Sequence, residues 1–307
     1  MAGFVVFAAF AAWSGLALGH GQGPHAAAGH WNWLPGQTGW LLFACTFYAV
    51  GCWRMQRARN LRKVLGPGRA ASFAAGMLTL FLALISPLDA LADQLFAAHM
   101  TQHLLLMIVA PPLLVSGRPV LVWLWAFPLS RRRDIGRWWN RAGRLRALQG
   151  FLMRPLTIWL LASAALWLWH VPRLYDWALS NELVHVVEHL CFFLTSLAFW
   201  TLVVEPYDAD RPNSGLAIAA VVTFALHSGL LGALLAFAPA SLYRTHNLSF
   251  PALSPLEDQQ IAGLIMWIPA SVIYLAALSV LFIDWLAQAD KLSKQHHIRG
   301  QPLSAPG

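Results

Sequence analysis

The segment HMTQHLLLMIVAPPLLVSG, residues 99–117, decides the fold. Its apolar length is that of a helix that crosses a membrane. It nevertheless begins with His99 and His103, four residues apart, which a helix stacks on one face. Met107 continues that face one turn further on, and Pro111–Pro112 then interrupts the backbone hydrogen-bond ladder. Because such side chains are costly inside a membrane span, they indicate a functional site.

A second apolar segment repeats this arrangement. In HVVEHLCFF, residues 185–193, His185 and His189 are also four residues apart. Two imidazoles at positions i and i+4 of one helix can share a metal ion, and a facing helix with a second pair can complete the ligand set. We therefore expect the two helices to face each other and to bring four imidazoles together.

The composition is that of a membrane protein with several spans. Of 307 residues, 58% are hydrophobic and 11% are charged, and runs of about 20 apolar residues indicate helices that cross a bilayer. The connections between these runs are short, which predicts an all-α, polytopic membrane helical bundle with one membrane domain. The formal net charge of +8 does not predict binding to nucleic acid, because the basic residues gather in alternate loops and no nucleic-acid motif accompanies them.

We expect about seven core transmembrane helices with an apolar segment before them. The expected spans are residues 34–53, 71–88, 97–116, 153–170, 182–204, 216–238 and 261–285. The apolar residues 1–19 are either a signal peptide or an additional span, since they lack the basic residues of a typical signal. The predicted division is this N-terminal segment, a His-containing outer segment at 20–33, a seven-span membrane domain at 34–285 and a cytoplasmic tail at 286–307.

The distribution of Arg and Lys predicts the orientation of the helices. Basic residues concentrate in residues 54–69, in the loop after the third span and in the C-terminal tail, and segments of this kind stay in the cytoplasm. The same alternation places nine of the twelve histidines outside the membrane or in its outer half. We therefore expect a cytoplasmic C-terminus and a His-rich face directed to the periplasm or the exterior.

Soft ligands accompany the histidines. The thioethers of Met100, Met107 and Met266 and the thiol of Cys191 favour Cu(I) over harder ions. We therefore predict a copper site that is built from the two histidine pairs and completed by Met107 or Met266. Copper, as Cu(I), is thus the expected cofactor or cargo.

Two acidic residues are expected to support this site. Glu188 directly precedes His189, and Asp258 lies about two helical turns before Met266. Carboxylates of this kind can fix the tautomers of metal-bound imidazoles. The predicted metal-site residues are His99, His103, His185, His189, Met107, Met266 and Asp258. The sequence holds no motif for hydrolysis, nucleophilic catalysis, phosphate binding or covalent haem, so we do not expect an enzyme.

Three stretches carry a resemblance to a known family. They are HMTQHLLLMIVAPPLLVSGRP at 99–119, HVVEHLCFFLTSLAFW at 185–200 and EDQQIAGLIMWIP at 257–269. With these motifs, the chain resembles the integral-membrane, multi-span CtaG family of bacterial cytochrome c oxidase assembly factors over about residues 33–285. The family's His-bearing motifs match the two histidine pairs, and its acidic-Gln motif matches Asp258, Gln259 and Gln260.

The resemblance implies an inner-membrane factor of bacteria that is needed to mature the haem–copper oxidase. Its implied partners are oxidase subunits and the lipid bilayer, and its implied task is to handle copper for an oxidase metal centre. Two other functions stay open at this point. The four histidines could be axial ligands in a haem-binding membrane protein, or they could form hydrogen bonds in a scaffold that binds no metal.

Overall fold

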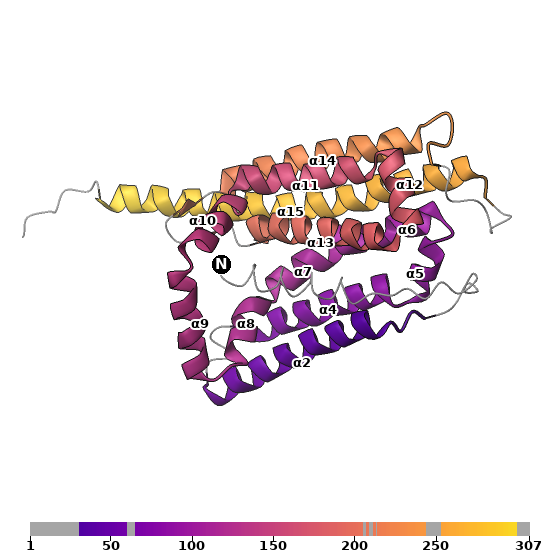
Figure 1. The fold of residues 1–307 in the computed structure, drawn as a ribbon. Helices are drawn as coiled ribbons and strands as arrows, with labels where there is room; N and C mark the ends of the chain where they lie inside the picture. Colours follow the sequence, from indigo (N-terminus) through magenta and orange to yellow (C-terminus); the bar gives the residue numbers. More distant parts are fainter. Residues whose placement is uncertain are drawn as a thin grey trace, which may run out of the picture.

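The computed structural model describes residues 31–59, 65–204, 207–208, 211–212, 214–243 and 253–299. Within these ranges the regular structure is helical apart from two paired strands of two residues each, β1 (Tyr207–Asp208) and β2 (Arg211–Pro212). Figure 1 shows long helices that lie side by side in one bundle. Residues 1–19 and the histidines of 20–33 lie outside the described residues, so the choice between a signal peptide and an extra span stays a prediction.

Helices occupy all seven ranges in which spans were expected. They are α2 (Pro35–Arg57), α4 (Gly66–Leu84), α6 (Phe96–Leu104) with its continuation α7 (Ala110–Ser116), α11 (Pro155–Trp169), α13 (Glu182–Val204), α14 (Ser214–Ala236) and α15 (Pro255–Arg299). Shorter helices connect them, namely α5 (Pro87–Ala92), α8 (Pro119–Trp125), α9 (Leu129–Arg141), α10 (Gly143–Leu152) and α12 (Pro172–Ser180).

The long apolar helices make the chain a multi-pass membrane protein. Among the described residues, five helices are long and apolar enough to cross a membrane, or six if α10 and α11, which meet at 67°, form one span. Seven were expected. The helix α2 does not meet this test because Gly, Gln and Thr dilute its first turns, and α11 has only 15 residues.

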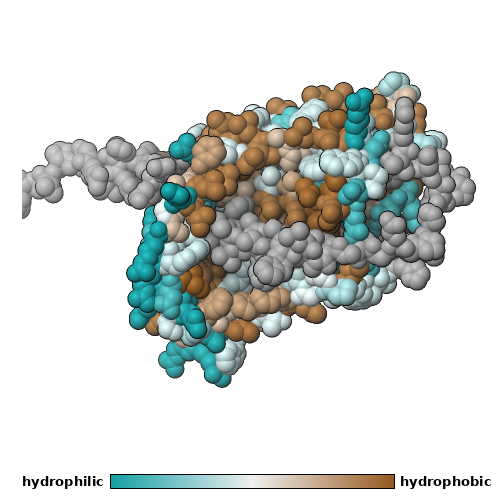
Figure 2. Space-filling view, in the orientation of Figure 1, coloured by the Kyte–Doolittle hydropathy of each residue, from teal (hydrophilic) through white to brown (hydrophobic). Residues whose placement is uncertain are grey.

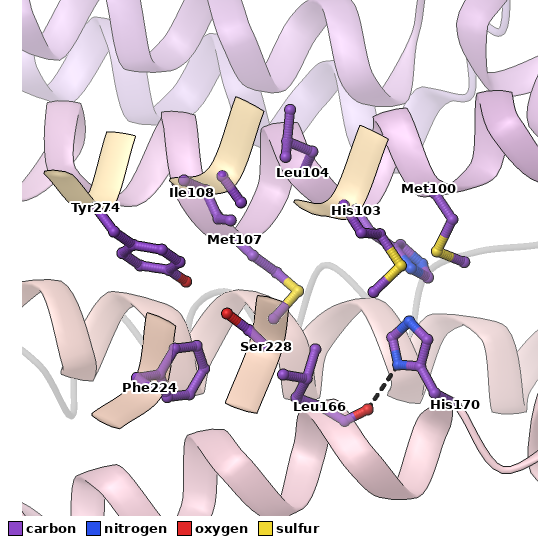
Figure 3. A pocket seen from close by; sticks show the side chains of 12 residues that line it. Met100, His103, Leu104, Met107, Ile108, Leu166, His170, Phe224, Ser228 and Tyr274 are labelled. Atoms are coloured by element: carbon purple, nitrogen blue, oxygen red, sulfur yellow. Dashed lines mark hydrogen bonds between the residues drawn. The ribbon is translucent and has the colours of Figure 1, made fainter. Parts of the chain in front are cut away.

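The third span changes its winding one turn after His103. The helix α6 continues at Leu105 as a π-helical segment, η1 (Leu105–Val109), before α7 begins. Pro111 has no N–H and cannot donate to the carbonyl of Met107 four residues earlier. The indole Nε1–H of Trp200 donates to that carbonyl instead, at 3.0 Å. Segments of π-helix are frequent at functional sites, and here the Met107 side chain points into a cavity (Figure 3).

Close packing of α14 on α15 fixes the position of α15. A Cβ atom at Gly263 would lie 2.4 Å from the backbone nitrogen of Ala236, and one at Gly232 would lie 3.0 Å from the carbonyl oxygen of Gly263. Small residues at such positions let two helices approach closely. The first turn of α15 also packs against α6, so the histidines of α6 depend on this arrangement.

The two ends of the bundle differ in their chemistry. The Arg-rich helix α9 lies across one end, whereas α5, the start of α6 and α12 lie at the other (Figure 1). Figure 2 shows hydrophilic residues along α9 and largely hydrophobic surface over the flanks of the bundle. Arginines at one end of a helical bundle are typical of a cytoplasmic membrane surface. The direction in which the chain crosses the membrane stays a prediction from this rule.

Candidate metal centre

The helices α6 and α13 bring the two histidine pairs together at the end of the bundle opposite α9. Within each pair, the ring centroids are 4.3 Å apart. Between the helices, the His99 ring lies 5.4 Å from that of His185, and the His103 ring lies 5.3 Å from that of His189. We call these four residues the histidine cluster.

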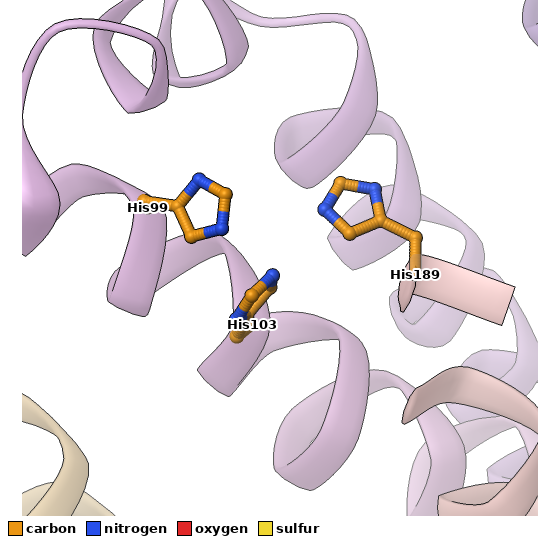
Figure 4. Close-up of side chains that lie close together, drawn as sticks. All are labelled: His99, His103 and His189. Carbon is orange, nitrogen blue, oxygen red and sulfur yellow. The ribbon is translucent and has the colours of Figure 1, made fainter. Parts of the chain in front are cut away.

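Two overlapping groups in this cluster have the spacing of metal ligands. Nitrogen atoms of His99, His103 and His189 all lie within 4.8 Å of one another, and Figure 4 shows the three rings converging from the two helices. A second group with the same spacing joins His99 and His185 to a carboxylate oxygen of Glu188. Three imidazoles, or two imidazoles and a carboxylate, are ligand sets that proteins use for zinc and copper.

Burial makes this cluster an unusual place for polar atoms. His99 and Glu188 are fully buried, and His103 is 3% exposed. Neither ring nitrogen of His103 and neither carboxylate oxygen of Glu188 makes a hydrogen bond to a residue that the structure describes. Buried polar groups are hydrogen-bonded in most proteins because an unsatisfied group costs about 1–3 kcal/mol. A bound cation would satisfy these atoms, so the residues present fit a metal ion.

Aromatic side chains close the cluster on two sides. The ring of Tyr175, from α12, lies 5.3 Å from that of His99, and the ring of Phe192 lies 4.7 Å from that of His103. Both aromatic residues are buried. Burial raises the pKa of the Tyr175 hydroxyl well above its ordinary value, so this group stays neutral beside the cluster. The surroundings exclude water and thereby strengthen electrostatic interactions with an ion.

Asp258 is in the first turn of α15, contacts the start of α6 and lies outside both groups of potential ligands. Its two carboxylate oxygens accept hydrogen bonds from the backbone N–H groups of Phe96 and Ala97, at 2.7 and 2.9 Å. These N–H groups belong to the first turn of α6, where a helix lacks internal acceptors and attracts negative charge. The structure thus places Asp258 so that it holds the helix that carries His99 and His103.

The two glutamines that follow Asp258 also bind the backbone. Gln259 accepts a hydrogen bond from the N–H of Leu242 at 2.6 Å and donates one to the carbonyl of Leu235 at 3.3 Å. Gln260 donates one to the carbonyl of Ala238 at 3.4 Å. The acidic-Gln motif therefore joins α15 to α6 and to the end of α14.

Met107 and Met266 lie beside the histidine cluster and not among its four imidazoles. Both line a cavity of about 30 Å³ next to His103, together with Met100, His170 and Tyr274 (Figure 3). Cys191, the other soft side chain considered from the sequence, is half-buried and belongs to neither of the two ligand groups. The expected thioethers are therefore adjacent to the cluster, on one side of it.

Sequence reasoning left two residues out of the expected metal ligands. Glu188 was considered only as a supporting residue, although its position three residues after His185 already places both on one helical face. His170, at the end of α11, lines the cavity beside His103. No spacing in the sequence could indicate this, because His170 has no partner histidine on its own helix.

Comparison with known proteins agrees with the motifs. A family described as "Cytochrome c oxidase caa3 assembly factor (Caa3_CtaG)" matches residues 46–288. Relatives include Uncharacterized protein ML1998 of Mycobacterium leprae (strain TN), 25% identical over 254 residues, and Uncharacterized protein Mb0105 of Mycobacterium bovis (strain ATCC BAA-935 / AF2122/97), 26% identical over 258 residues. These alignments cover 80% and 81% of this chain, which spans only 38% of the length of each relative.

No solved structure matches this chain. The family match, in contrast, covers most of the chain and includes both histidine pairs and the acidic-Gln motif. It confirms the resemblance that these motifs indicated. The chain belongs to the cytochrome c oxidase caa3 assembly factor (Caa3_CtaG) family.

Proposed function

We propose that this protein assists the assembly of a caa3-type cytochrome c oxidase by binding copper, as Cu(I), at the histidine cluster and passing it to an oxidase subunit. The observation that carries the proposal is the convergence of His99, His103 and His189 within a buried part of the bundle. The family name supplies the context of oxidase assembly. Copper is here a cargo of the protein and not a catalytic group.

The chemistry of the neighbouring residues supports Cu(I) as the cargo. Imidazole nitrogens suit copper and zinc, and thioethers favour Cu(I). Met100, Met107 and Met266 line the cavity directly beside His103. A site with only two or three neutral ligands leaves room on Cu(I) for a further ligand. A ligand of the partner protein can therefore replace one of the ligands of this chain. Release to a partner requires such exchange.

A haem group fits this region less well. The ring of His99 lies 4.3–6.3 Å from the rings of the other three histidines, and that of His189 lies 4.3 and 5.3 Å from those of His185 and His103. A porphyrin does not fit between rings that are so close and that also share a helix face. The cavity beside His103 is about 30 Å³, whereas sites for drug-sized ligands have about 300–1,000 Å³. The haem-binding alternative therefore receives no support from the geometry.

The proposed orientation places the histidine cluster at the outer side of a bacterial plasma membrane. The support is the position of α9, at the other end of the bundle, because its arginines are expected in the cytoplasm. An outward cluster would exchange copper with a membrane-bound partner on the same side. Cysteine labelling from outside intact cells, at a position introduced into α12, would test this orientation.

The proposal is tested with protein purified in mild detergent and loaded with Cu(I) under a reductant. We expect wild-type protein to retain copper, the His99→Ala/His103→Ala variant to lose it, and His227→Ala to retain it as the control in a neighbouring span. Elemental analysis gives the copper content, and the visible spectrum reports haem. The amount of copper-containing oxidase in cells that carry each variant gives the functional consequence.

Each outcome separates the alternatives. Copper that is lost only in the double variant, with a matching loss of oxidase, supports delivery. A Soret band would indicate haem. Wild-type protein that binds neither metal nor haem, while the double variant still blocks oxidase assembly, would replace copper delivery with a scaffold function.

A further inference from the structure

The cavity beside His103 is lined by potential metal ligands that belong to neither ligand group of the histidine cluster. It is lined by three thioethers, from Met100, Met107 and Met266, and by the imidazoles of His103 and His170. These side chains come from α6 with its continuation η1, from α15 and from the end of α11, so three separate parts of the chain meet there. Its volume of about 30 Å³ accommodates an occupant the size of a water molecule.

The hydrogen bonding of His170 gives this cavity a free nitrogen ligand. The ring nitrogen Nδ1 lies 2.6 Å from the carbonyl oxygen of Leu166. A carbonyl oxygen only accepts hydrogen bonds, so Nδ1 carries the hydrogen and the lone pair of the neutral ring is on Nε2. This Nε2 atom is buried and has no hydrogen-bond partner among the described residues. Histidines that bind metals through Nε2 are typically fixed by such an Nδ1–H bond to a carbonyl.

The side chains of the proposed ligands also point toward the cavity. Figure 3 shows the Met100 and Met107 side chains directed into the space next to His103, with the His170 ring at its edge and its Nδ1 atom turned toward Leu166. Met100 and Met107 are 1% and 7% exposed. The remaining lining includes the apolar residues Leu104, Ile108 and Phe224 and two hydroxyl-bearing residues, Ser228 and Tyr274. Neutral hydroxyls are harder ligands than thioethers and imidazoles, so Cu(I) prefers the latter.

We infer that this cavity is a second Cu(I) position, with Nε2 of His170 and the thioethers of Met100, Met107 and Met266 as its ligands. The inference rests on the proposed function, because it gives copper a second place within the same protein. His103 lines the cavity and also belongs to the ligand group with His99 and His189. One Cu(I) ion therefore moves between the two positions by ligand exchange, in which imidazole nitrogens are released as thioether sulfurs bind and the oxidation state is unchanged.

The two positions hold copper with different ligand chemistry. The histidine cluster offers imidazole nitrogens, with the carboxylate of Glu188 beside them, whereas the cavity offers three thioether sulfurs and the nitrogen of His170, next to the shared His103. Thioethers bind Cu(I) and discriminate against Zn²⁺ and Cu(II). A position of this kind selects the reduced ion, and the neighbouring histidines can then take it over.

X-ray absorption at the copper edge distinguishes the two positions, because sulfur and nitrogen neighbours scatter differently. The wild-type protein is purified in mild detergent and loaded with Cu(I) at less than one equivalent under a reductant. We expect sulfur neighbours in wild-type protein and their loss in the Met100→Leu/Met107→Leu/Met266→Leu variant, since leucine keeps the volume and removes the ligand. Met77→Leu, at a buried methionine of α4 that does not line the cavity, is the matched control and should keep the sulfur signal.

Two further variants assign the ligands. Cys191→Ala should keep the sulfur signal, because the proposed ligands are thioethers. This variant excludes the Cys191 thiol as the source of the signal. His170→Gln should weaken Cu(I) binding by at least about tenfold in competition with a colorimetric Cu(I) chelator, as expected for loss of a ligand or of its support.

Several results would overturn the inference. Copper in wild-type protein with only nitrogen or oxygen neighbours would overturn it even if the triple variant does not fold. Sulfur neighbours that disappear in Cys191→Ala would do the same. Wild-type protein that binds no copper at all would instead overturn the proposed function itself.

Discussion

Two histidine regions within the spans of this bundle differ in how their polar atoms are satisfied. In the first region, His227 of α14 accepts a hydrogen bond from the Trp167 indole at Nδ1, 3.2 Å away, and its Nε2 lies 3.0 Å from the Ser163 hydroxyl. Both ring nitrogens are thus bound within the protein. In the second region, and counting partners only in the part of the chain that the structure describes, His103 forms no hydrogen bond through either nitrogen and His170 forms one through Nδ1 only.

The two buried carboxylates differ in the same way. Asp258 accepts two backbone hydrogen bonds at the start of α6, whereas the carboxylate of Glu188 has no hydrogen-bond partner among the described residues. Residues of one type therefore have different hydrogen bonding within the same bundle. The satisfied groups hold helices together, and the unsatisfied groups are the ones available to an ion. The predictions below compare one group of each kind.

The largest expected effect contrasts two histidines. His189→Gln should lower the affinity for Cu(I) by more than about 100-fold, beyond the 10–100-fold that loss of a supporting residue costs, because it removes one of three imidazoles in the ligand group. His227→Gln should leave the affinity within about threefold of wild type, since the His227 nitrogens are already bound and losing them changes stability alone. Chelator competition measures both. Equal losses in the two variants would break the distinction between the regions.

Glu188→Leu should have opposite effects on stability and on binding. Without copper, it should raise the free energy of unfolding by about 1–3 kcal/mol, because it removes a buried polar group that makes no hydrogen bond to any described residue. With copper, the gain in melting temperature should be smaller than in wild type, because one potential ligand is lost. Thermal unfolding in detergent, with and without Cu(I), reports both. A copper-free variant that is less stable than wild type would show that Glu188 has a structural partner.

Asp258→Ala should reduce stability while copper binding is retained. It leaves the N–H groups of Phe96 and Ala97 without their acceptor, and loss of a helix cap of this kind costs about 0.5–2 kcal/mol. Copper content at saturation should equal that of wild type, since Asp258 belongs to neither ligand group. Loss of copper in a variant that remains folded would instead support the expectation, made from the sequence, that Asp258 is part of the metal site.

The main features of this region could be expected from the sequence because they are local. The i, i+4 spacing fixes His99 with His103 and His185 with His189 on their helix faces, whatever the rest of the fold does. Apolar runs and Arg distribution likewise predict a multi-pass bundle. The span count differs from the expected seven, since five or six of the described helices are long and apolar enough to cross a membrane. One reason is that α11 has only 15 residues and continues α10 at a bend of 67° that no hydropathy pattern reveals.

Other features depend on contacts between distant segments and could not be predicted. Asp258 and Phe96 are 162 residues apart in the chain, so the sequence does not reveal the hydrogen bond between them. Asp258 was instead interpreted as part of the metal site, because its motif lies close to Met266 in the sequence. The hydrogen bond to Leu166 fixes the ring of His170, and three methionines from other segments line the same cavity as this ring. Such roles follow from packing, and packing decides which polar atoms keep a free lone pair.

The smallest expected effect concerns the indole N–H of Trp200, which is hydrogen-bonded although it lies next to the cavity that Met107 lines. Trp200→Phe removes the indole N–H that donates to the carbonyl of Met107. Pro111 has no N–H and cannot replace this donor. It should lower the free energy of unfolding by about 1 kcal/mol, measured by thermal unfolding without copper. The ring of Trp200 also stacks on Tyr274 at 6.1 Å, and phenylalanine retains an aromatic face there. Cu(I) affinity should change by less than about threefold. A loss as large as that of His189→Gln would mean that this hydrogen bond, by fixing the π-helical segment, controls access of copper to both positions.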